Sequence, residues 1–205
     1  PMLAPHLATT VIEILLGLVL GTLLGSAAAL TMILSPLLKR WLLPVLVISQ
    51  AIPVFALAPI LVLWLGYGMA SKVAMAVLII FFPVTASLYD GMRRTDHDLL
   101  DLARIMGASP AGVLRHIVLP SALPAFAAGL RVAAAVAPIG AVIGEWVGSS
   151  EGLGFYMLHA NARMQVDLMF AALTLLAAAS LTLYFCIDRL LDRLVFWQPK
   201  HGTMP

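Results

Sequence analysis

Charged residues are scarce in this chain of 205 residues. Asp, Glu, Lys and Arg make up 11% of the sequence, whereas a soluble domain averages about a quarter. Hydrophobic residues make up 62%, and the mean hydropathy is +1.03. This composition excludes an ordinary soluble domain and indicates a protein embedded in a membrane. The sequence pI of about 9.0 therefore does not point to nucleic acid as a partner.

Several reactive groups are missing or isolated. The chain has one cysteine, Cys186, and cannot form an intrachain disulfide. It contains no G-x-x-x-x-G-K-[ST] phosphate-binding loop, so any ATP hydrolysis must occur on another chain. His159 has no second potential ligand at a useful spacing, which argues against a metal site. We expect no catalytic residue, no metal and no cofactor.

Five apolar segments are long enough to cross a bilayer as helices. Spanning about 30 Å takes roughly 20 residues, and backbone groups in lipid must be satisfied within the segment. No alternation typical of strands is visible. The sequence therefore predicts an all-α polytopic membrane helical bundle that forms a single transmembrane domain over residues 1–205. The predicted spans cover residues 7–34, 43–65, 70–88, 122–147 and 168–187.

Basic residues are distributed unequally between the two sides of the predicted bundle. Nine of the twelve fall on the side that holds the segment between the third and fourth spans. Lys72 and Arg163 fall on the other side, and Arg131 falls within the fourth span. Because basic residues are enriched on the cytoplasmic side, this pattern predicts a cytoplasmic C-terminus. The nine are Lys39, Arg40, Arg93, Arg94, Arg104, Arg115, Arg189, Arg193 and Lys200.

The polar segment between the third and fourth spans predicts a helical hairpin. Thr95 is a candidate N-cap, with Asp98 three residues later as in a capping box. Gly107 can adopt the left-handed conformation that ends helices, and Ser109 followed by Pro110 is typical of a new helix start. Local chemistry alone allows two interpretations. The hairpin either lies against the bilayer or its own helices, or it protrudes as a knob for a partner's groove.

The spacing in this hairpin resembles the EAA loop of ATP-binding-cassette (ABC) importer permeases. Asp101-Leu102-Ala103 is followed by Gly107 after three residues, and Ile117-Val118-Leu119-Pro120 follows after nine more. Asp101 stands where Glu is commoner, and Leu102 replaces the first Ala. The resemblance implies a type I ABC importer permease in which residues 101–107 form the coupling helix. Within residues 95–120 it assigns ATPase coupling to Asp101, Leu102, Ala103, Arg104, Gly107, Ile117, Leu119 and Pro120.

The same resemblance implies the partners of the chain. The protein would be a transport subunit of the bacterial inner membrane and not an enzyme. It would form a homodimer with the solute path at the dimer interface. Two copies of a separate ATPase would bind its loops, and an extracytoplasmic solute-binding protein would deliver the solute. Relatives of this type carry one more N-terminal span, so we expect a sixth span to be missing ahead of Pro1.

Other segments resemble permeases of the nitrate/sulfonate/taurine importer group. They are residues 50–53, Trp64-Leu65-Gly66, Phe81-Phe82-Pro83 and Gly129-Leu130-Arg131.

Within that group, three further segments are most similar to permeases for pyrimidine precursors of thiamine. They cover residues 144–148, 151–154 and 159–163. The resemblance implies a hydroxymethylpyrimidine-like solute, with a sulfonate, taurine or nitrate as the alternative.

Three polar residues are candidates for the solute pathway, because charged and polar groups inside a membrane are costly. Arg131 either ties to helix carbonyls or a carboxylate, or lies on the inward part of the pathway. Glu145 is either an interfacial residue beside Trp146, or a gate or docking residue. Gln50 either lines the pathway or bonds to a neighbouring helix. Arg131 and Glu145 lie about 21 Å apart along one helix and cannot pair, and Glu13 is predicted to be interfacial.

Glycines recur at four-residue spacing in the first span, at Gly17, Gly21 and Gly25. Glycines in this register leave a flat stripe that another helix can approach closely. The stripe predicts either packing within one subunit or a dimer contact.

Two other classes of protein remain as alternatives. An ion-coupled secondary transporter needs paired intramembrane carboxylates or broken helices in matching halves. Glu13 and Glu145 are the candidates, and transport without an ATPase would indicate this class. An intramembrane hydrolase needs a Ser/His arrangement, a carboxylate pair or a metal cluster within the spans. The five histidines instead fall outside the spans or at their edges.

Overall fold

Residues 3–197, which a computed structural model describes, fold into nine α-helices and one short π-helical segment. No strand occurs within this range, which confirms the all-α class. Lys200, one of the nine basic residues counted above, lies outside the described residues. The elements are α1 (Ala4–Leu34), α2 (Pro36–Ala51), α3 (Val54–Leu65), α4 (Met69–Arg93), α5 (His97–Ile105), α6 (Pro110–Val113), η1 (Leu114–Val118), α7 (Leu119–Gly148), α8 (Leu153–Ala162) and α9 (Val166–Leu194).

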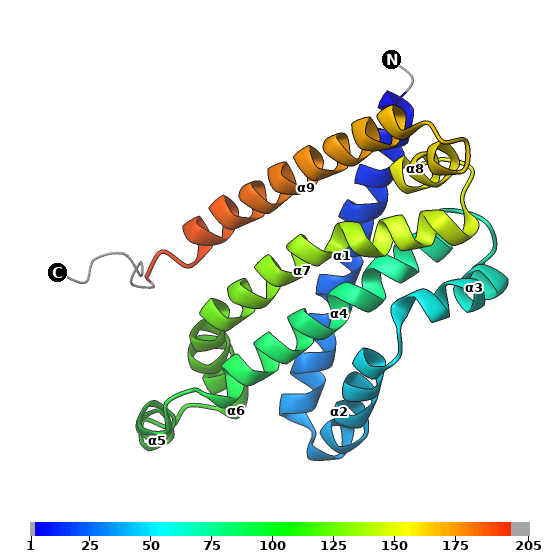
Figure 1. Ribbon diagram of the computed structural model, residues 1–205. Helices are drawn as coiled ribbons and strands as arrows, with labels where there is room; N and C mark the ends of the chain where they lie inside the picture. The colour runs from blue at the N-terminus through cyan, green and yellow to red at the C-terminus, as the bar shows by residue number, and fades with distance from the viewer. Residues whose placement is uncertain (1–2, 198–205) are drawn as a thin grey trace.

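Three long helices run side by side, and a fourth crosses them. Figure 1 shows α4, α7 and α9 lying next to one another, with α1 passing across α4 and α7. The α5–α6 hairpin lies at one end of this arrangement, and α8 and α3 lie at the other. The main core forms where α1, α4 and α7 meet. Its buried members are Ile14, Leu18, Ala76, Ile80, Val84, Ala133, Ala134, Ala137 and Ala141.

Four of the five predicted spans are single helical runs. Four runs within residues 3–197 are long and apolar enough to cross a bilayer, and the bent pair of α2 and α3 makes a fifth if it is counted as one span. The predicted single helix over residues 43–65 is wrong, because α2 and α3 meet at an angle of 107°. Pro53 explains the break, since it disfavours helical backbone at the residue before it. Ile52 is extended accordingly, with a ψ of 124°.

The second arm of the hairpin continues directly into the fourth span. Helical structure runs without interruption from Pro110 to Gly148, over 39 residues. Within it, η1 widens the helix so that the Leu119 N–H donates to the Leu114 carbonyl. The next residue is Pro120, which has no N–H to donate to the helix. The hairpin is therefore rigidly continuous with α7 on one side, while a turn joins it to α4 on the other.

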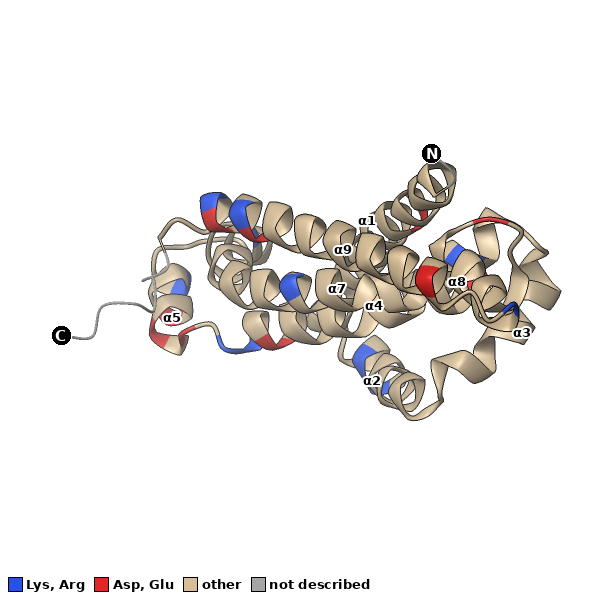
Figure 2. Cartoon of the chain, turned by 45° about the horizontal axis from the view of Figure 1, so that its top comes forward, with Lys and Arg blue, Asp and Glu red and all other residues tan. Residues whose placement is uncertain are grey.

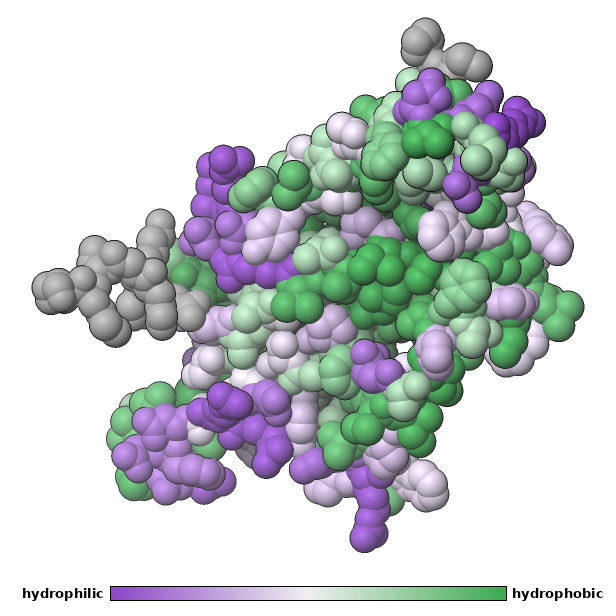
Figure 3. Space-filling model, viewed as in Figure 1, coloured by the Kyte–Doolittle hydropathy of each residue, from purple (hydrophilic) through white to green (hydrophobic). Residues whose placement is uncertain are grey.

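The surface has the polarity expected of a membrane protein. In Figure 2, charged residues gather at the two ends of the bundle and on α2, and most of α4, α7 and α9 carries none. The face drawn in Figure 3 is apolar across its middle, with hydrophilic residues near its margins. Helix α9 buries only Ala172 and Leu191. Most of its apolar surface is therefore available to lipid or to another chain.

Small residues allow α1 and α7 to approach α4 from two sides. A Cβ built on Gly140 of α7 would lie 2.6 Å from the Cα of Ala76. A Cβ on Gly17 of α1 would overlap the Cβ of the same alanine. Gly21 and Gly25 lie similarly close to α4 residues. The glycine stripe of α1 thus packs within the chain, as one of the two interpretations predicted.

We expect Gly140→Leu to destabilise the bundle. Its side chain would meet the α4 backbone, which cannot rotate away, and overpacking of this kind costs about 1–3 kcal/mol or more. Thermal unfolding in detergent would measure the loss. Ala135→Leu is the matched control, because Ala135 lies on the exposed side of the same helix. Equal melting temperatures for the two variants would contradict the close α4–α7 contact.

Candidate functional site

The first candidate site is the hairpin, and its first arm is α5. Asp96 caps this helix by accepting a hydrogen bond from the Asp98 N–H at 2.9 Å. The predicted cap at Thr95 is wrong. Thr95 is buried, and its hydroxyl instead donates to the Met92 carbonyl at the end of α4, at 2.9 Å. The helix therefore starts one residue later than predicted.

Gly107 forms the bend of the hairpin, as predicted. Its φ is +77°, in the left-handed region. The Gly107 N–H donates to the Arg104 carbonyl, and the Ala108 N–H donates to the Ala103 carbonyl, both at 3.0 Å. This pair of bonds is the Schellman motif, which ends a helix on glycine. The Ser109 hydroxyl then caps the second arm by accepting from the Gly112 N–H at 3.2 Å.

The hairpin tip exposes large apolar side chains. Ile105 is 85% exposed and Met106 is 77% exposed, and Leu99 and Leu102 are exposed beside them. Ala103, in contrast, is buried. Figure 1 shows α5 projecting from the bundle and not lying along it. Exposed apolar side chains on a projecting helix are typical of a surface that a partner covers.

Charged and buried residues surround this apolar tip. Arg104 forms an exposed ion pair with Asp101 on the same helix, with 2.9 Å between Nη1 and Oδ1. Ile117, Leu119 and Pro120 are half-buried where η1 enters α7. Apart from the buried Ala103 and the bend at Gly107, the predicted coupling residues thus divide into an exposed group on α5 and a half-buried group where the second arm enters α7.

Arg131 lies in an ion-pair cluster between α7 and α9. Its Nε lies 2.5 Å from Asp188 Oδ1, and its Nη2 lies 2.7 Å from Asp192 Oδ1. The two aspartates are one helical turn apart and face α7 together. Sequence reasoning did not pair them with Arg131, although their four-residue spacing near the end of an apolar run was a usable signal.

Gln50 lies at the break in the second span. It is exposed near the end of α2, and its Nε2 lies 3.4 Å from the Ser49 hydroxyl on the same helix. It is adjacent to the bend between α2 and α3, but no contact with another helix holds it within the described residues.

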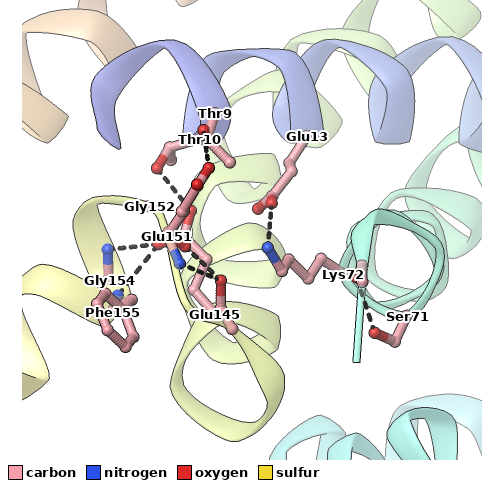
Figure 4. Close-up of polar contacts among 12 residues, drawn as sticks. Thr9, Thr10, Glu13, Ser71, Lys72, Glu145, Glu151, Gly152, Gly154 and Phe155 are labelled. Atoms are coloured by element: carbon pink, nitrogen blue, oxygen red, sulfur yellow. Dashed lines mark hydrogen bonds and ion pairs between the residues drawn. The ribbon is translucent and has the colours of Figure 1, made fainter. Parts of the chain in front are cut away.

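Glu145 is buried and forms the centre of a second candidate site, which Figure 4 shows. Its carboxylate accepts hydrogen bonds from the Thr10 hydroxyl at 2.5 Å, from the Gly154 N–H and from the Phe155 N–H at 3.3 Å. Glu145 is only 1% exposed, and all of these bonds are to groups within the chain. The carboxylate sits at the N-terminus of α8, where the helix dipole favours a negative charge.

The other N–H groups at the N-terminus of α8 donate to side chains of α1. The Gly152 N–H donates to His6 Nδ1 at 3.0 Å, and the Leu153 N–H donates to the Thr10 hydroxyl at 2.8 Å. Side chains of α1 and α7 therefore satisfy four consecutive N–H groups at the start of α8. A helix has four such donors without internal partners, and here each one is tied to a neighbouring helix.

A buried ion pair lies beside this carboxylate. Lys72 Nζ of α4 is 2.9 Å from Glu13 Oε1 of α1, and both side chains are almost fully buried. The sequence did not predict that Glu13 pairs with Lys72. Together with Thr10 and Glu145, these residues connect four helices: α1, α4, α7 and α8 (Figure 4). This group of residues is called the polar cluster below.

Comparison with known proteins identifies the family of the chain. The family described as "Binding-protein-dependent transport system inner membrane component" matches residues 17–197. The chain belongs to this family of ABC importer permeases. Within residues 3–197, no group of three His, Cys, Asp or Glu side chains is placed to bind a metal.

Relatives of this permease cover most of its length. It is 62% identical to a "Probable ABC transporter permease protein" of Haemophilus influenzae, over 95% of this chain and 80% of that protein. It is 40% identical to the formylaminopyrimidine transport permease protein ThiX of Halalkalibacterium halodurans, over 95% and 78%. It is 41% identical to the riboflavin transport system permease protein RibX of Chloroflexus aurantiacus, over 78% and 60%.

A solved structure shares the fold of this permease. The MetNI methionine ABC transporter, in an inward-facing conformation, matches with a TM-score of 0.73 and 22% identity over 94% of each chain. This likeness shows the fold of a type I ABC importer permease.

We expect Glu145→Ala to loosen α8. The change leaves the Thr10 hydroxyl and two backbone N–H groups without their buried acceptor, at a cost of about 1–3 kcal/mol for each unsatisfied group. Hydrogen exchange should become faster at residues 153–155 and stay unchanged in α5. Glu151→Ala is the control, because Glu151 is exposed and its side chain accepts only one long bond, 3.5 Å from Thr9. Unchanged exchange at α8 would show that Glu145 does not hold it.

Proposed function

We propose that this permease imports a pyrimidine precursor of thiamine, of the hydroxymethylpyrimidine type. The observation that carries this proposal is the 40% identity to a formylaminopyrimidine permease over 95% of the chain. The resemblance of residues 144–148 and 151–154 to pyrimidine permeases agrees with it. These two segments meet in the structure, where Glu145 accepts a hydrogen bond from the Gly154 N–H.

Two other solute classes define the alternatives. The likeness to a riboflavin permease reaches 41% identity but covers 78% of the chain. A sulfonate, taurine or nitrate is the other alternative solute, because the segment around Pro53 resembles permeases of the nitrate/sulfonate/taurine group. These solutes differ in charge and size, so uptake experiments separate them directly.

The hairpin is proposed as the docking site for a separate ATPase chain. The exposed Ile105 and Met106 would enter an apolar groove of the ATPase, while Asp101 and Arg104 would bind at its rim. Gly107 sets the direction in which α5 projects. Ile117, Leu119 and Pro120 would transmit force from the hairpin into α7, with which they are continuous.

The proposed assembly contains two permease copies, two ATPase subunits and one external binding protein. The end of the bundle that carries the hairpin would face the cytoplasm, as would the C-terminus, because most Lys and Arg residues lie at that end. ATP binding would draw the two hairpins together and open the path outward, and hydrolysis would reset it. The extensive exposed apolar surface of α2, α3 and α9 supports a partner copy or lipid around this chain.

The three predicted pathway residues take different proposed roles. Gln50 is exposed at the bend between α2 and α3, and we assign it to the lining of the path. Arg131 and Glu145 would act on the path through the helices that they tie together. Arg131 holds α9 to α7, and Glu145 holds α8 to α7 and α1.

We expect Gly107→Pro to abolish ATPase docking without unfolding the permease. Proline fixes φ near −65°, whereas Gly107 has a φ of +77°, so the bend must change. Copurification of the ATPase and stimulation of its activity measure the loss. Gly66→Pro is the matched control, because Gly66 has a φ of +82°, donates its N–H to the Val62 carbonyl and lies at the opposite end of the bundle.

Both proline variants should lose similar stability, about 1–3 kcal/mol for a strained backbone position. Only the Gly107 variant should lose the ATPase. Normal stimulation by Gly107→Pro would overturn the coupling role of the hairpin.

The substrate proposal predicts ATP-dependent uptake of a labelled aminopyrimidine. Cells that express the complete transporter should accumulate this solute in preference to labelled taurine and riboflavin. A hydrolysis-dead ATPase should remove the uptake. Accumulation of taurine or riboflavin instead would overturn the substrate and keep the importer. Uptake that persists with the dead ATPase would indicate an ion-coupled transporter.

A further inference from the structure

A groove lies between the hairpin and the ends of the spanning helices. Its volume is about 530 Å³. One wall comes from the last turn of α1, with Ile33 and Leu34, and another from the end of α4, with Met92. The hairpin closes it with Leu100 and Val113. Since α1 and α4 are long and apolar enough to cross the membrane, we expect their ends, and with them the groove, to lie at the depth of the lipid headgroups.

The charges in the wall of this groove have one sign. Arg93 and Arg104 line it, and no acidic residue does. Arg93 also lies over the ring of Tyr89, at 5.7 Å, and Lys39 lies over the same ring at 5.6 Å. Arg104 is paired with Asp101, but both side chains are largely exposed, so water screens this pair strongly.

The combination of an apolar wall and two guanidinium groups selects an anionic amphiphile. Free phosphate would pair with the arginines but would leave the apolar wall exposed to water. A neutral lipid would cover the apolar wall but would leave the two arginines without an anionic partner. Basic pockets between spanning helices on the cytoplasmic side are typical binding sites for anionic lipid headgroups.

We propose that this groove binds one anionic phospholipid. Its phosphate lies between Arg93 and Arg104, and one acyl chain runs along Ile33, Leu34 and Val113 toward the bilayer. The lipid would fill the space between the hairpin and α1, beneath the face of α5 that is proposed to meet the ATPase. Arg104 lines the groove but is largely exposed, so it would contact the phosphate on one side and the rim of the ATPase groove on the other. The site rests on the proposed orientation, in which the hairpin end faces the cytoplasm.

Native mass spectrometry of the purified permease tests this site. The protein would be exchanged into detergent that contains equal amounts of phosphatidylglycerol and phosphatidylcholine. We expect one phosphatidylglycerol to be retained. The double variant Arg93→Gln/Arg104→Gln should reduce its retention by about tenfold or more, since each basic residue near an anionic headgroup contributes about a factor of five.

Two further variants separate a built site from general attraction. Arg94→Gln removes a neighbouring exposed charge that does not line the groove, and it should retain the lipid. Val113→Trp keeps both arginines but fills the space for the chain, and it should lose the lipid. Thermal unfolding checks that each variant is folded. Equal loss with Arg94→Gln, or equal retention of the two lipids, would overturn the proposal.

Two added components test the other occupants. Millimolar inorganic phosphate should leave the bound phosphatidylglycerol in place, and displacement would show that the groove binds only phosphate. Addition of the ATPase should also leave it in place, and release would show that a side chain of the ATPase fills the groove. Because retention requires neither transport nor a solute, its outcome is independent of the uptake experiment.

Discussion

Close contact of three helices at small residues is the constraint on which this permease depends. Ala76 of α4 lies where α1 and α7 both come nearest, and the absence of side chains at Gly17 and Gly140 makes both approaches possible. In lipid, the hydrophobic effect does not drive helices together, so tight packing must supply the attraction. The hairpin extends from one end of this packed α4–α7 pair. The polar cluster forms at the other end, between helices whose spacing the pair determines.

The polar cluster shows how a short helix can be placed at the end of a membrane bundle. The N-terminus of α8 would carry unsatisfied donors in a medium that offers few acceptors, which is costly. The carboxylate of Glu145 and the side chains of His6 and Thr10 remove that cost. The same bonds fix the position of α8 relative to α1 and α7. The position of α8 is therefore specified by hydrogen-bond geometry as well as by the apolar packing of Leu153 and Met157.

Sequence patterns predicted the features that depend on local chemistry. The lengths of the apolar segments predicted the spans, and Gly107 followed by Ser109-Pro110 predicted the hairpin. The wrong predictions concern residues whose position is determined by tertiary contacts. Burial of Thr95 against α4 moved the helix cap to Asp96. The hydrogen bonds of Glu145 could not be predicted, because Thr10 is 135 residues away in the sequence and the Gly154 N–H reaches the carboxylate only once the chain has turned into α8. Pro53 indicates the 107° bend locally. The bend was missed because the span was predicted from the apolar character of the whole segment, which does not change at the proline.

The uninterrupted helix from Pro110 to Gly148 connects the hairpin end of the chain to the end that carries the polar cluster. At about 1.5 Å per residue, its 39 residues form a rod of about 58 Å. Its first turn belongs to the hairpin, and Glu145 lies in its last turn. A displacement of one end can therefore be transmitted to the other end without passing through a loop. The π-helical segment η1 and the prolines inside α7 are the places where the helix can bend. The two ends of the permease are thus joined by one continuous helix, so that under the proposed ATPase docking a movement of the hairpin would reach the carboxylate that holds α8.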